Sequence, residues 1–262
     1  LFVRCQALGI EFMSTPFDED AARFLLNLGM RRIKVPSGEI TNDPFLRFLA
    51  GKGLPMILST GMADMDEIHR AVAVVAAARA EAGLREPLRE VLTILHCTSN
   101  YPAACSDVNL RAMQSIAREL ELPVGYSDHT LGLAVSTAAV ALGASVIEKH
   151  FTLDREMPGP DHKASLSLEE LAALVRQIRD VENALGSPEK RPTASELPIR
   201  ALVRRSVTLV RAARAGQALQ AEDMTLLRPG TGIGPGELER IPGRVLTRDL
   251  PAGTTLQWTD LA

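Results

Sequence analysis

Two histidines, each following a short apolar stretch, have the residue type and spacing that most suggest chemistry. His129 lies in "VGYSDHTLG" (124–132), and His150 lies 21 residues later in "SVIEKHFT" (145–152). If both stretches are neighbouring parallel strands, about 4.8 Å apart, the imidazoles can converge on one metal ion. Two histidine ligands leave positions open for water or a substrate carbonyl, a Lewis-acid arrangement. The alternative is two hydrogen-bonded polar residues in separate loops.

Other polar side chains also follow apolar stretches. One lysine, several hydroxyls and loop amides around a barrel mouth can bind phosphate, which needs positive charge and many donors. The alternative for each fragment is ordinary strand-end and capping chemistry, and a turn cap is the simpler role for Asp161 in "MPGPDHKAS", although it can also orient a polyol. These fragments contain Lys34, Ser37 and Glu39 in "KVPSGE", Ser59 and Thr60 in "LSTGM", and Thr98, Ser99 and Tyr101 in "HCTSNYP".

An alternation of short apolar runs and helical patterns must position these residues. Six runs read as strands, and helices are expected between them because capping residues precede apolar periodicity. Strict alternation predicts a parallel sheet with crossover helices. Polar residues follow many different strands and no dinucleotide-type Gly-x-Gly-x-x-Gly is present, which favours a (β/α)8 TIM barrel over an open sheet. The expected strands are "IEFMST", "RIKVPS", "PMILST", "VLTILHC", "PVGYS" and "SVIEKHF"; the expected helices are 18–28, 43–51, 64–82, 109–120, 131–142 and 168–185.

Six strand–helix units are fewer than eight, and "LFVRCQALG" at the start reads as the end of a helix closed by Gly9. We therefore expect two further units in front. The barrel domain is predicted over 1–187, a Pro- and Ser-rich linker over 188–203, and a small β-rich domain over 204–262. In that domain "AGQALQAEDM" (215–224) is echoed by "AGTTLQWTDL" (252–261), as expected for two similar turn-and-strand units.

Composition excludes several classes of protein. The net charge of −3 gives no global attraction to nucleic acid or anionic membranes, although residues 200–262 hold nine Arg against six Asp or Glu. The three cysteines are odd in number and lack metal-type spacing, so a reducing compartment is expected. No apolar run is long enough to span a membrane. We expect a cytoplasmic protein.

Taken in order, the motifs resemble the sialic acid synthases, including the legionaminic acid synthases. The resemblance rests on "KVPSGEI", "ILSTGM", "LHCTSNYP", "VGYSDHTLG", "IEKHFTLD" and "GPDHKAS". The tail, with "RRSV", "LRPGTGIGP" and "GRVLTRDLPAGTTL", resembles the antifreeze-like (SAF, β-clip) domain of those enzymes. The family also has a first loop with a catalytic glutamate, which this sequence lacks. Either this sequence is an N-terminally incomplete version of a full enzyme or the gene product is truncated. In the second case the protein is expected to be poorly folded and inactive.

The resemblance implies an enzyme that condenses phosphoenolpyruvate with an open-chain N-acylhexosamine and releases phosphate. It implies a divalent ion, Mn²⁺ or Mg²⁺, that polarises the sugar aldehyde. It also implies a homodimer with exchanged SAF domains, in which Arg228 reaches the neighbouring subunit's site. The implied metal ligands are His129 and His150; the implied phosphoenolpyruvate-binding residues are Lys34, Ser37, Ser59, Ser99 and Ser127; the implied sugar-binding residues are Glu39, Tyr101, Asp161 and Arg228; and the implied catalytic residues are Glu39, His129, His150 and Asp161.

Three functions compete. The preferred one is N-acetylneuraminate synthase using N-acetylmannosamine, with N,N'-diacetyllegionaminate or pseudaminate synthase, using a 2,4-diacetamido-trideoxyhexose, as the alternative product. A second enzyme class is a 3-deoxy-octulosonate synthase acting on a phosphorylated sugar. The third possibility is a non-catalytic remnant that binds carbohydrate or a partner.

Overall fold

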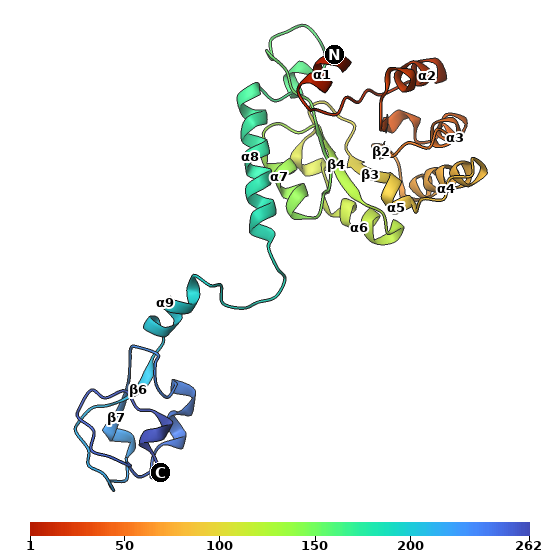
Figure 1. Ribbon diagram of the computed structural model, residues 1–262. Helices are drawn as coiled ribbons and strands as arrows, with labels where there is room; N and C mark the ends of the chain where they lie inside the picture. Colours follow the sequence, from red (N-terminus) through yellow and green to blue (C-terminus); the bar gives the residue numbers. More distant parts are fainter. The chain divides into compact units, whose positions relative to one another are not determined.

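The computed structural model describes all residues from Leu1 to Ala262, which form two compact units, Leu1–Gly186 and Ser187–Ala262 (Figure 1). The first unit contains α1 (Phe2–Ala7), α2 (Glu19–Leu28), β1 (Ile33–Val35), α3 (Asp43–Ala50), β2 (Met56–Ser59), α4 (Met65–Glu81), α5 (Leu88–Val91), β3 (Leu92–Cys97), α6 (Arg111–Leu120), β4 (Val124–Asp128), α7 (Ala134–Ala141), β5 (Ile147–Lys149) and α8 (Leu168–Leu185). The second unit contains α9 (Glu196–Val203), β6 (Ser206–Leu209) and β7 (Met224–Leu227). Part of the predicted linker is thus the helix α9.

The sheet of the first unit has five parallel strands in the order β1-β2-β3-β4-β5. Helices connect successive strands and lie outside the sheet, as Figure 1 shows for α3, α4 and α6. Sequential parallel strands with crossover helices are the arrangement of a (β/α)-barrel. The barrel-type α/β fold is therefore confirmed, as an open sheet with unpaired edges at β1 and β5. The expectation of two further units in front stays a prediction.

The predicted strand at the start of the chain was wrong. Residues 10–15 adopt no regular structure, and no ladder hydrogen bonds join them to β1. Side chains hold this segment instead: Phe12 packs on the hydrophobic core, and Glu11 pairs with Arg32 at 3.2 Å. The apolar residues of this segment do not all pack: Phe12 contacts the core, while Ile10 and Met13 are exposed. The five later strands formed where predicted.

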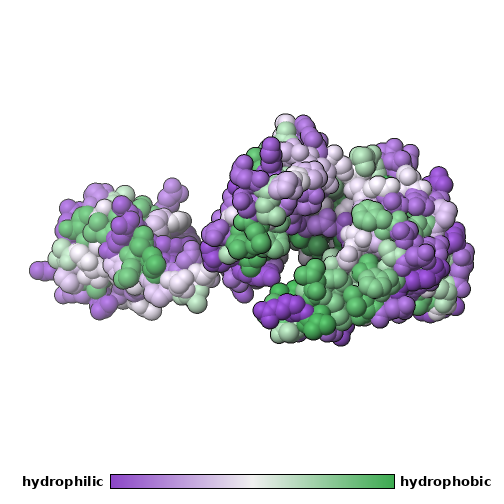
Figure 2. All heavy atoms as spheres, turned by 90° about the horizontal axis from the view of Figure 1, so that it is seen from above, coloured by the Kyte–Doolittle hydropathy of each residue, from purple (hydrophilic) through white to green (hydrophobic).

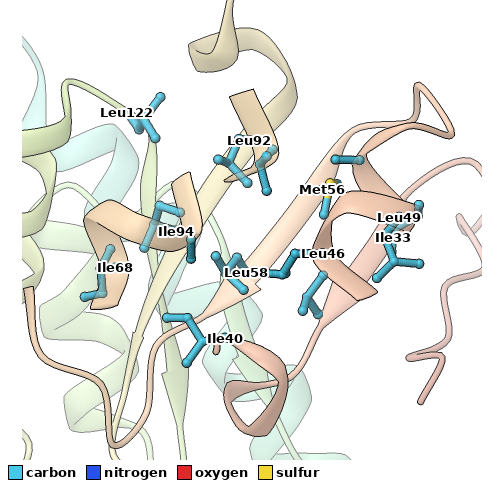
Figure 3. Close-up of a cluster of buried hydrophobic side chains, with 14 of the residues drawn as sticks. Ile33, Ile40, Leu46, Leu49, Met56, Leu58, Ile68, Leu92, Ile94 and Leu122 are labelled. Carbon is cyan, nitrogen blue, oxygen red and sulfur yellow. The ribbon is translucent and has the colours of Figure 1, made fainter. Parts of the chain in front are cut away.

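The core of the first unit lies between the sheet and its helices. Residues of alternate positions, such as Met56 and Leu58 of β2, belong to the same buried cluster as Leu46 of α3 and Ile68 of α4 (Figure 3). Leu58 is fully buried, and burying such a side chain contributes about 1.5–3 kcal/mol. Because side chains alternate across a strand, the intervening positions face the opposite side of the sheet. The same short strands therefore build the core on one face and present polar groups on the other.

Helix termini mostly follow the predicted capping chemistry. Asp18, Asp64 and Ser167 each accept a backbone N–H in the first turn of their helix, and Asp64 and Ser167 form full capping boxes. Two helices, predicted over 43–51 and 109–120, are not capped by the first residue of the predicted range. Asn42, rather than Asp43, caps α3, because its side chain accepts from Phe45 N. Asn109 has a left-handed backbone, and α6 begins at Arg111 without a side-chain cap.

The second unit is a small β domain in which the sequence repeat has a structural counterpart. Asp223 accepts from the backbone N–H of Gln220 at 2.8 Å, and Asp260, 37 positions later, accepts from that of Gln257 at 2.9 Å. Ala213 and Leu250, each two residues before one copy of the repeat, are antiparallel bridge partners, and each donates its N–H to the other's carbonyl. The two copies thus pair with each other about an approximate twofold axis.

None of the helices combines the length and apolar character that crossing a bilayer requires. The surface of the first unit nevertheless carries exposed apolar side chains, including Phe17 and Met62. Figure 2 shows a hollow in this unit with hydrophobic surface along one side.

Candidate active site

A pocket of about 560 Å³ opens at the carboxyl ends of the five strands. Each strand contributes a residue from its final positions, because alternate side chains face the inner side of the sheet. This volume is in the range of small-molecule sites. The strand residues that line the pocket include Lys34 of β1, Ser59 of β2, Cys97 of β3, Ser127 of β4 and Glu148 of β5; the loops that follow add Ser37, Ser99, Tyr101, His129 and His150.

Lys34 supplies a buried positive charge to this pocket. Its side chain is only 7% exposed, and Nζ lies 3.3 Å from Oε2 of Glu148. The other carboxylate oxygen of Glu148 accepts a 2.7 Å hydrogen bond from Ser127 Oγ. An anionic ligand entering here meets a lysine and a serine that are already oriented by one carboxylate.

Ser59 carries a polar atom that the protein leaves unsatisfied. Its hydroxyl is buried and has no hydrogen-bond partner. Buried polar atoms are rarely unpaired, because each costs about 1–3 kcal/mol of desolvation. A hydroxyl of this kind at the wall of a pocket is positioned to bond a ligand oxygen.

Gly61 allows three neighbouring loops to approach one another closely. A Cβ there would lie 2.2 Å from Ser99 Oγ, 2.9 Å from Ser37 Oγ and 3.2 Å from Cys97 Sγ. Its backbone N–H instead donates to Ser37 Oγ at 2.9 Å. The absence of a side chain thus brings two predicted ligand-binding serines together.

His129 and His150 lie on adjacent strand ends with ring centroids 5.4 Å apart. His129 Nδ1 donates to the carbonyl oxygen of Thr98 at 2.9 Å, which leaves Nε2 as the nitrogen with a free lone pair. Burial lowers the pKa of His150, so this imidazole is neutral near neutral pH. Neutral imidazoles are the form that binds metal, so these residues fit a divalent cation. No cluster of three or more His, Cys, Asp or Glu side chains is arranged around an ion site.

Tyr101 packs against both histidines. Its ring centroid is 4.1 Å from that of His129 and 5.8 Å from that of His150, the latter edge-on. Burial, followed by the charges of Cys97, Asp161 and Glu148, raises the pKa of Tyr101, so its phenol stays protonated and can donate.

The remaining predicted residues are not among those that line the pocket. Glu39 lies at the end of a 3-10 turn, Ser37–Glu39, and accepts a 2.7 Å hydrogen bond from Asn42. Asp161 is exposed, and its backbone carbonyl accepts from Ser165 Oγ, but its charge still acts on His150 and Tyr101. Arg228 belongs to the second unit, where its Nε donates to the carbonyl of Val203 at 2.8 Å.

Sequence reasoning missed Glu148. It faces the pocket between Lys34 and Ser127, yet it was taken only as part of a strand. The signal was present, because Glu148 and His150 are two positions apart and therefore point to the same side of an extended chain.

The open barrel sheet with polar strand ends around one pocket defines a protein of the (β/α)-barrel class with a candidate ligand site at the carboxyl ends of its strands. Comparison with known proteins narrows this class: residues 1–190 match the NeuB family, and residues 204–262 match the SAF domain. The chain therefore belongs to the NeuB family and carries a SAF domain.

Several relatives are similar over nearly the whole chain. An N,N'-diacetyllegionaminic acid synthase of Legionella pneumophila is 56% identical over 252 residues, which cover 96% of this chain and 69% of that protein. The corresponding synthase of Campylobacter jejuni is 43% identical, covering 95% of this chain and 72% of that protein. The crystal structure of an N-acetylneuraminic acid (sialic acid) synthetase from Leptospira borgpetersenii, in complex with citrate, matches with a TM-score of 0.67 at 36% identity, covering 75% of this chain and 66% of that one.

Proposed function

We propose that this protein is an N,N'-diacetyllegionaminate synthase, which joins phosphoenolpyruvate to a 2,4-diacetamido-trideoxyhexose and releases phosphate. The observation that carries the proposal is the pocket itself. It combines an anion-binding side, around Lys34 and Ser59, with two cation-ready imidazoles, those of His129 and His150. A reaction between an anionic enol phosphate and a sugar aldehyde needs an anion-binding side for the first and a bound cation for the second.

The anion-binding side is assigned to phosphoenolpyruvate. Lys34 supplies the buried charge, while the hydroxyls of Ser37, Ser59, Ser99 and Ser127 are donors from four neighbouring chain segments. Charge-assisted hydrogen bonds to phosphate and carboxylate are about twice as strong as neutral ones. The unpaired hydroxyl of Ser59 supports this assignment, since a ligand oxygen would satisfy it.

His129 and His150 are assigned to a divalent ion, with Mn²⁺ preferred and Mg²⁺ as the alternative. When bound, the ion polarises the sugar aldehyde. The enol carbon of phosphoenolpyruvate attacks that aldehyde to form the new carbon–carbon bond, water adds at the adjacent carbon, and phosphate leaves. Lys34 and the hydroxyls hold the enol phosphate in position during these steps.

The sugar is assigned to Tyr101 at the pocket wall, together with Glu39, Asp161 and the neighbouring subunit's Arg228. For Glu39 this assignment requires that its hydrogen bond with Asn42 be exchanged for the ligand. The Arg228 assignment requires a homodimer with exchanged SAF domains, in which the guanidinium supplies directed donors to the sugar.

The product assignment changes from the one preferred on motifs alone. The motifs favoured N-acetylneuraminate, with N,N'-diacetyllegionaminate as an alternative. An N,N'-diacetyllegionaminic acid synthase is 56% identical and a second one 43% identical over 249 residues. N-acetylneuraminate-9-phosphate synthases are 43% identical over 193 residues (human) and 39% identical over 242 residues (mouse), and a pseudaminic acid synthase is 32% identical. The 56% relative supports the diacetamido sugar.

A phosphate-release assay with phosphoenolpyruvate and Mn²⁺ tests the proposal. We expect release that depends on the sugar, with a higher kcat/KM for the 2,4-diacetamido-trideoxyhexose than for N-acetylmannosamine. A higher value for N-acetylmannosamine would return the assignment to N-acetylneuraminate. Phosphoenolpyruvate and metal binding without turnover of either sugar would instead support the non-catalytic interpretation.

A further inference from the structure

The residues that immediately precede the two histidines in the sequence form a buried ion pair. Asp128 precedes His129, Lys149 precedes His150, and Lys149 Nζ lies 2.9 Å from Asp128 Oδ2. The two side chains are 0% and 3% exposed, and the two residues are register partners of β4 and β5. Charges are rarely buried so completely unless they are paired, and a buried pair of this kind can hold neighbouring groups in place.

The pair holds Thr130 at three points. Asp128 Oδ1 accepts from the backbone N–H of Thr130 at 2.8 Å and from its hydroxyl at 2.7 Å, while Lys149 Nζ donates to its carbonyl oxygen at 2.5 Å. Ser136 of α7 donates to the other carboxylate oxygen of Asp128 at 2.5 Å. His129 therefore lies between two anchored residues, Asp128 and Thr130. Lys149, which precedes His150 on β5, bonds both of them.

Alternation along the strands gives this anchor its effect on the site. Ser127 and Glu148 meet on the pocket face, whereas Asp128 bonds Ser136 of α7 on the opposite, helix-covered face. The next position on each strand is a histidine, again on the pocket face. A slip of one residue between β4 and β5 would reverse these faces and separate the imidazoles. The ion pair between register partners opposes such a slip.

We propose that Asp128 and Lys149 are positioning residues that set the spacing and direction of the His129 and His150 imidazoles, and thereby the affinity of the metal site. This inference rests on the proposed function, because it assigns a metal to the two histidines. Asp128 does not line the pocket; Lys149 does, but its Nζ is engaged by Asp128 Oδ2 and by the carbonyl oxygen of Thr130 rather than free for a ligand. Their effect is exerted through the backbone of Thr130 and through the β4–β5 register.

The inference is tested by measuring the binding of Mn²⁺ alone to the full chain, with the loss of the EPR signal of free Mn²⁺ as the readout. Lys149→Met keeps much of the side-chain volume but cannot pair, and we expect Mn²⁺ binding to weaken about 10- to 100-fold, the range for groups that orient metal ligands. The double variant Asp128→Asn with Lys149→Met removes both charges, so it avoids leaving a single buried charge. It is expected to regain thermal stability relative to the single variant while Mn²⁺ binding stays weak.

Val124→Ala is the control for lost stability. Val124 is buried at the opposite end of β4, so its truncation lowers the melting temperature without touching the ion pair. It should bind Mn²⁺ as tightly as the wild type. If the double variant binds Mn²⁺ with wild-type affinity, the inference is overturned while the proposed function stands. If the wild-type chain binds no Mn²⁺, the assigned metal site fails and the inference falls with it.

Discussion

The imidazoles of His129 and His150 lie 5.4 Å apart, centroid to centroid, and the ring of Tyr101 packs against both. The carbonyl oxygen of Thr98 fixes the ring of His129 through Nδ1. A metal ligand whose second nitrogen is bonded in this way has its tautomer and direction set in advance. The two rings therefore form one unit of the pocket rather than two separate loop residues.

Replacing either ring is expected to abolish cation binding. His129→Ala and His150→Ala should each lose detectable Mn²⁺ binding in calorimetry and lower kcat/KM by at least about 100-fold. His69→Ala is the matched control, because His69 is half exposed on α4, outside the pocket. Unchanged Mn²⁺ affinity in both site variants would refute the assignment of these residues as ligands.

Ser59→Ala should act in opposite directions on stability and on ligand binding. The wild-type hydroxyl is buried and unpaired, so removing it should leave the free protein as stable as before or more stable by up to about 1 kcal/mol. The KM for phosphoenolpyruvate should nevertheless rise by about tenfold, the effect of one lost hydrogen bond to a charged group.

Ser145→Ala provides the contrast for Ser59. The hydroxyl of Ser145 already donates to the carbonyl of Val124 at 2.8 Å, so its loss should lower the melting temperature and leave the KM unchanged. If both variants lower stability equally and neither changes the KM, Ser59 does not bind phosphoenolpyruvate.

Gly61→Ala should disrupt the anion-binding side without a large loss of the fold. The added Cβ would overlap the hydroxyl oxygens of Ser99 and Ser37, and both side chains would have to move. We expect an increase of about tenfold or more in the KM for phosphoenolpyruvate. At Gly38, on the same pocket, a Cβ meets no atom within 4 Å. Gly38→Ala should therefore have the smaller effect, and the reverse order would contradict this role of Gly61.

Much of this arrangement follows from local sequence signals. The strands β1 to β5 are short apolar runs bounded by polar residues, and the ends of α2, α4 and α8 carry strong capping signals. These features depend on neighbouring residues only. The segment 10–15 is also a short run with apolar residues but adopts no strand, because strand formation needs a paired neighbour that a local pattern cannot reveal.

Part of the site was also predictable from local sequence signals. Residues that end strands, such as Lys34 and His129, converge because the carboxyl ends of parallel strands lie at one edge. Glu39 also follows a strand, but it lies at the end of a 3-10 turn, where its hydrogen bond with Asn42 sets the direction of its side chain. The Asp128–Lys149 pair depends on the register between β4 and β5, which cannot be predicted from either segment alone.

The stability of the second unit should depend on pH through Asp223. Hydrogen bonds from the backbone of Gln220 and from Arg211 hold the pKa of Asp223 below its ordinary value. A lowered folded-state pKa contributes stability above the unfolded-state pKa, and this contribution is lost as the pH falls through the folded value. We therefore expect the urea midpoint to fall from about pH 4 downward.

Trp258 makes this measurement selective. It is the only tryptophan of the chain and belongs to the second unit, so its fluorescence follows that unit within the full protein. Asp223→Asn should lower the midpoint at neutral pH and flatten its dependence on pH in the acidic range. Glu222→Gln, at the exposed neighbouring position, should leave both unchanged. An unchanged acidic slope in Asp223→Asn would show that other carboxylates cause the acid sensitivity.

The mutual pairing of Ala213 and Leu250 gives the second unit the character of a homodimer fused into one polypeptide. The N–H of Leu256 in the second copy bonds the carbonyl of Val207, eight residues before the first copy, and the N–H of Leu219 in the first copy bonds the carbonyl of Arg244, eight residues before the second. Neither copy completes its own backbone hydrogen bonds. We therefore expect damage to one copy to unfold the other as well, so that the two copies melt in a single cooperative transition.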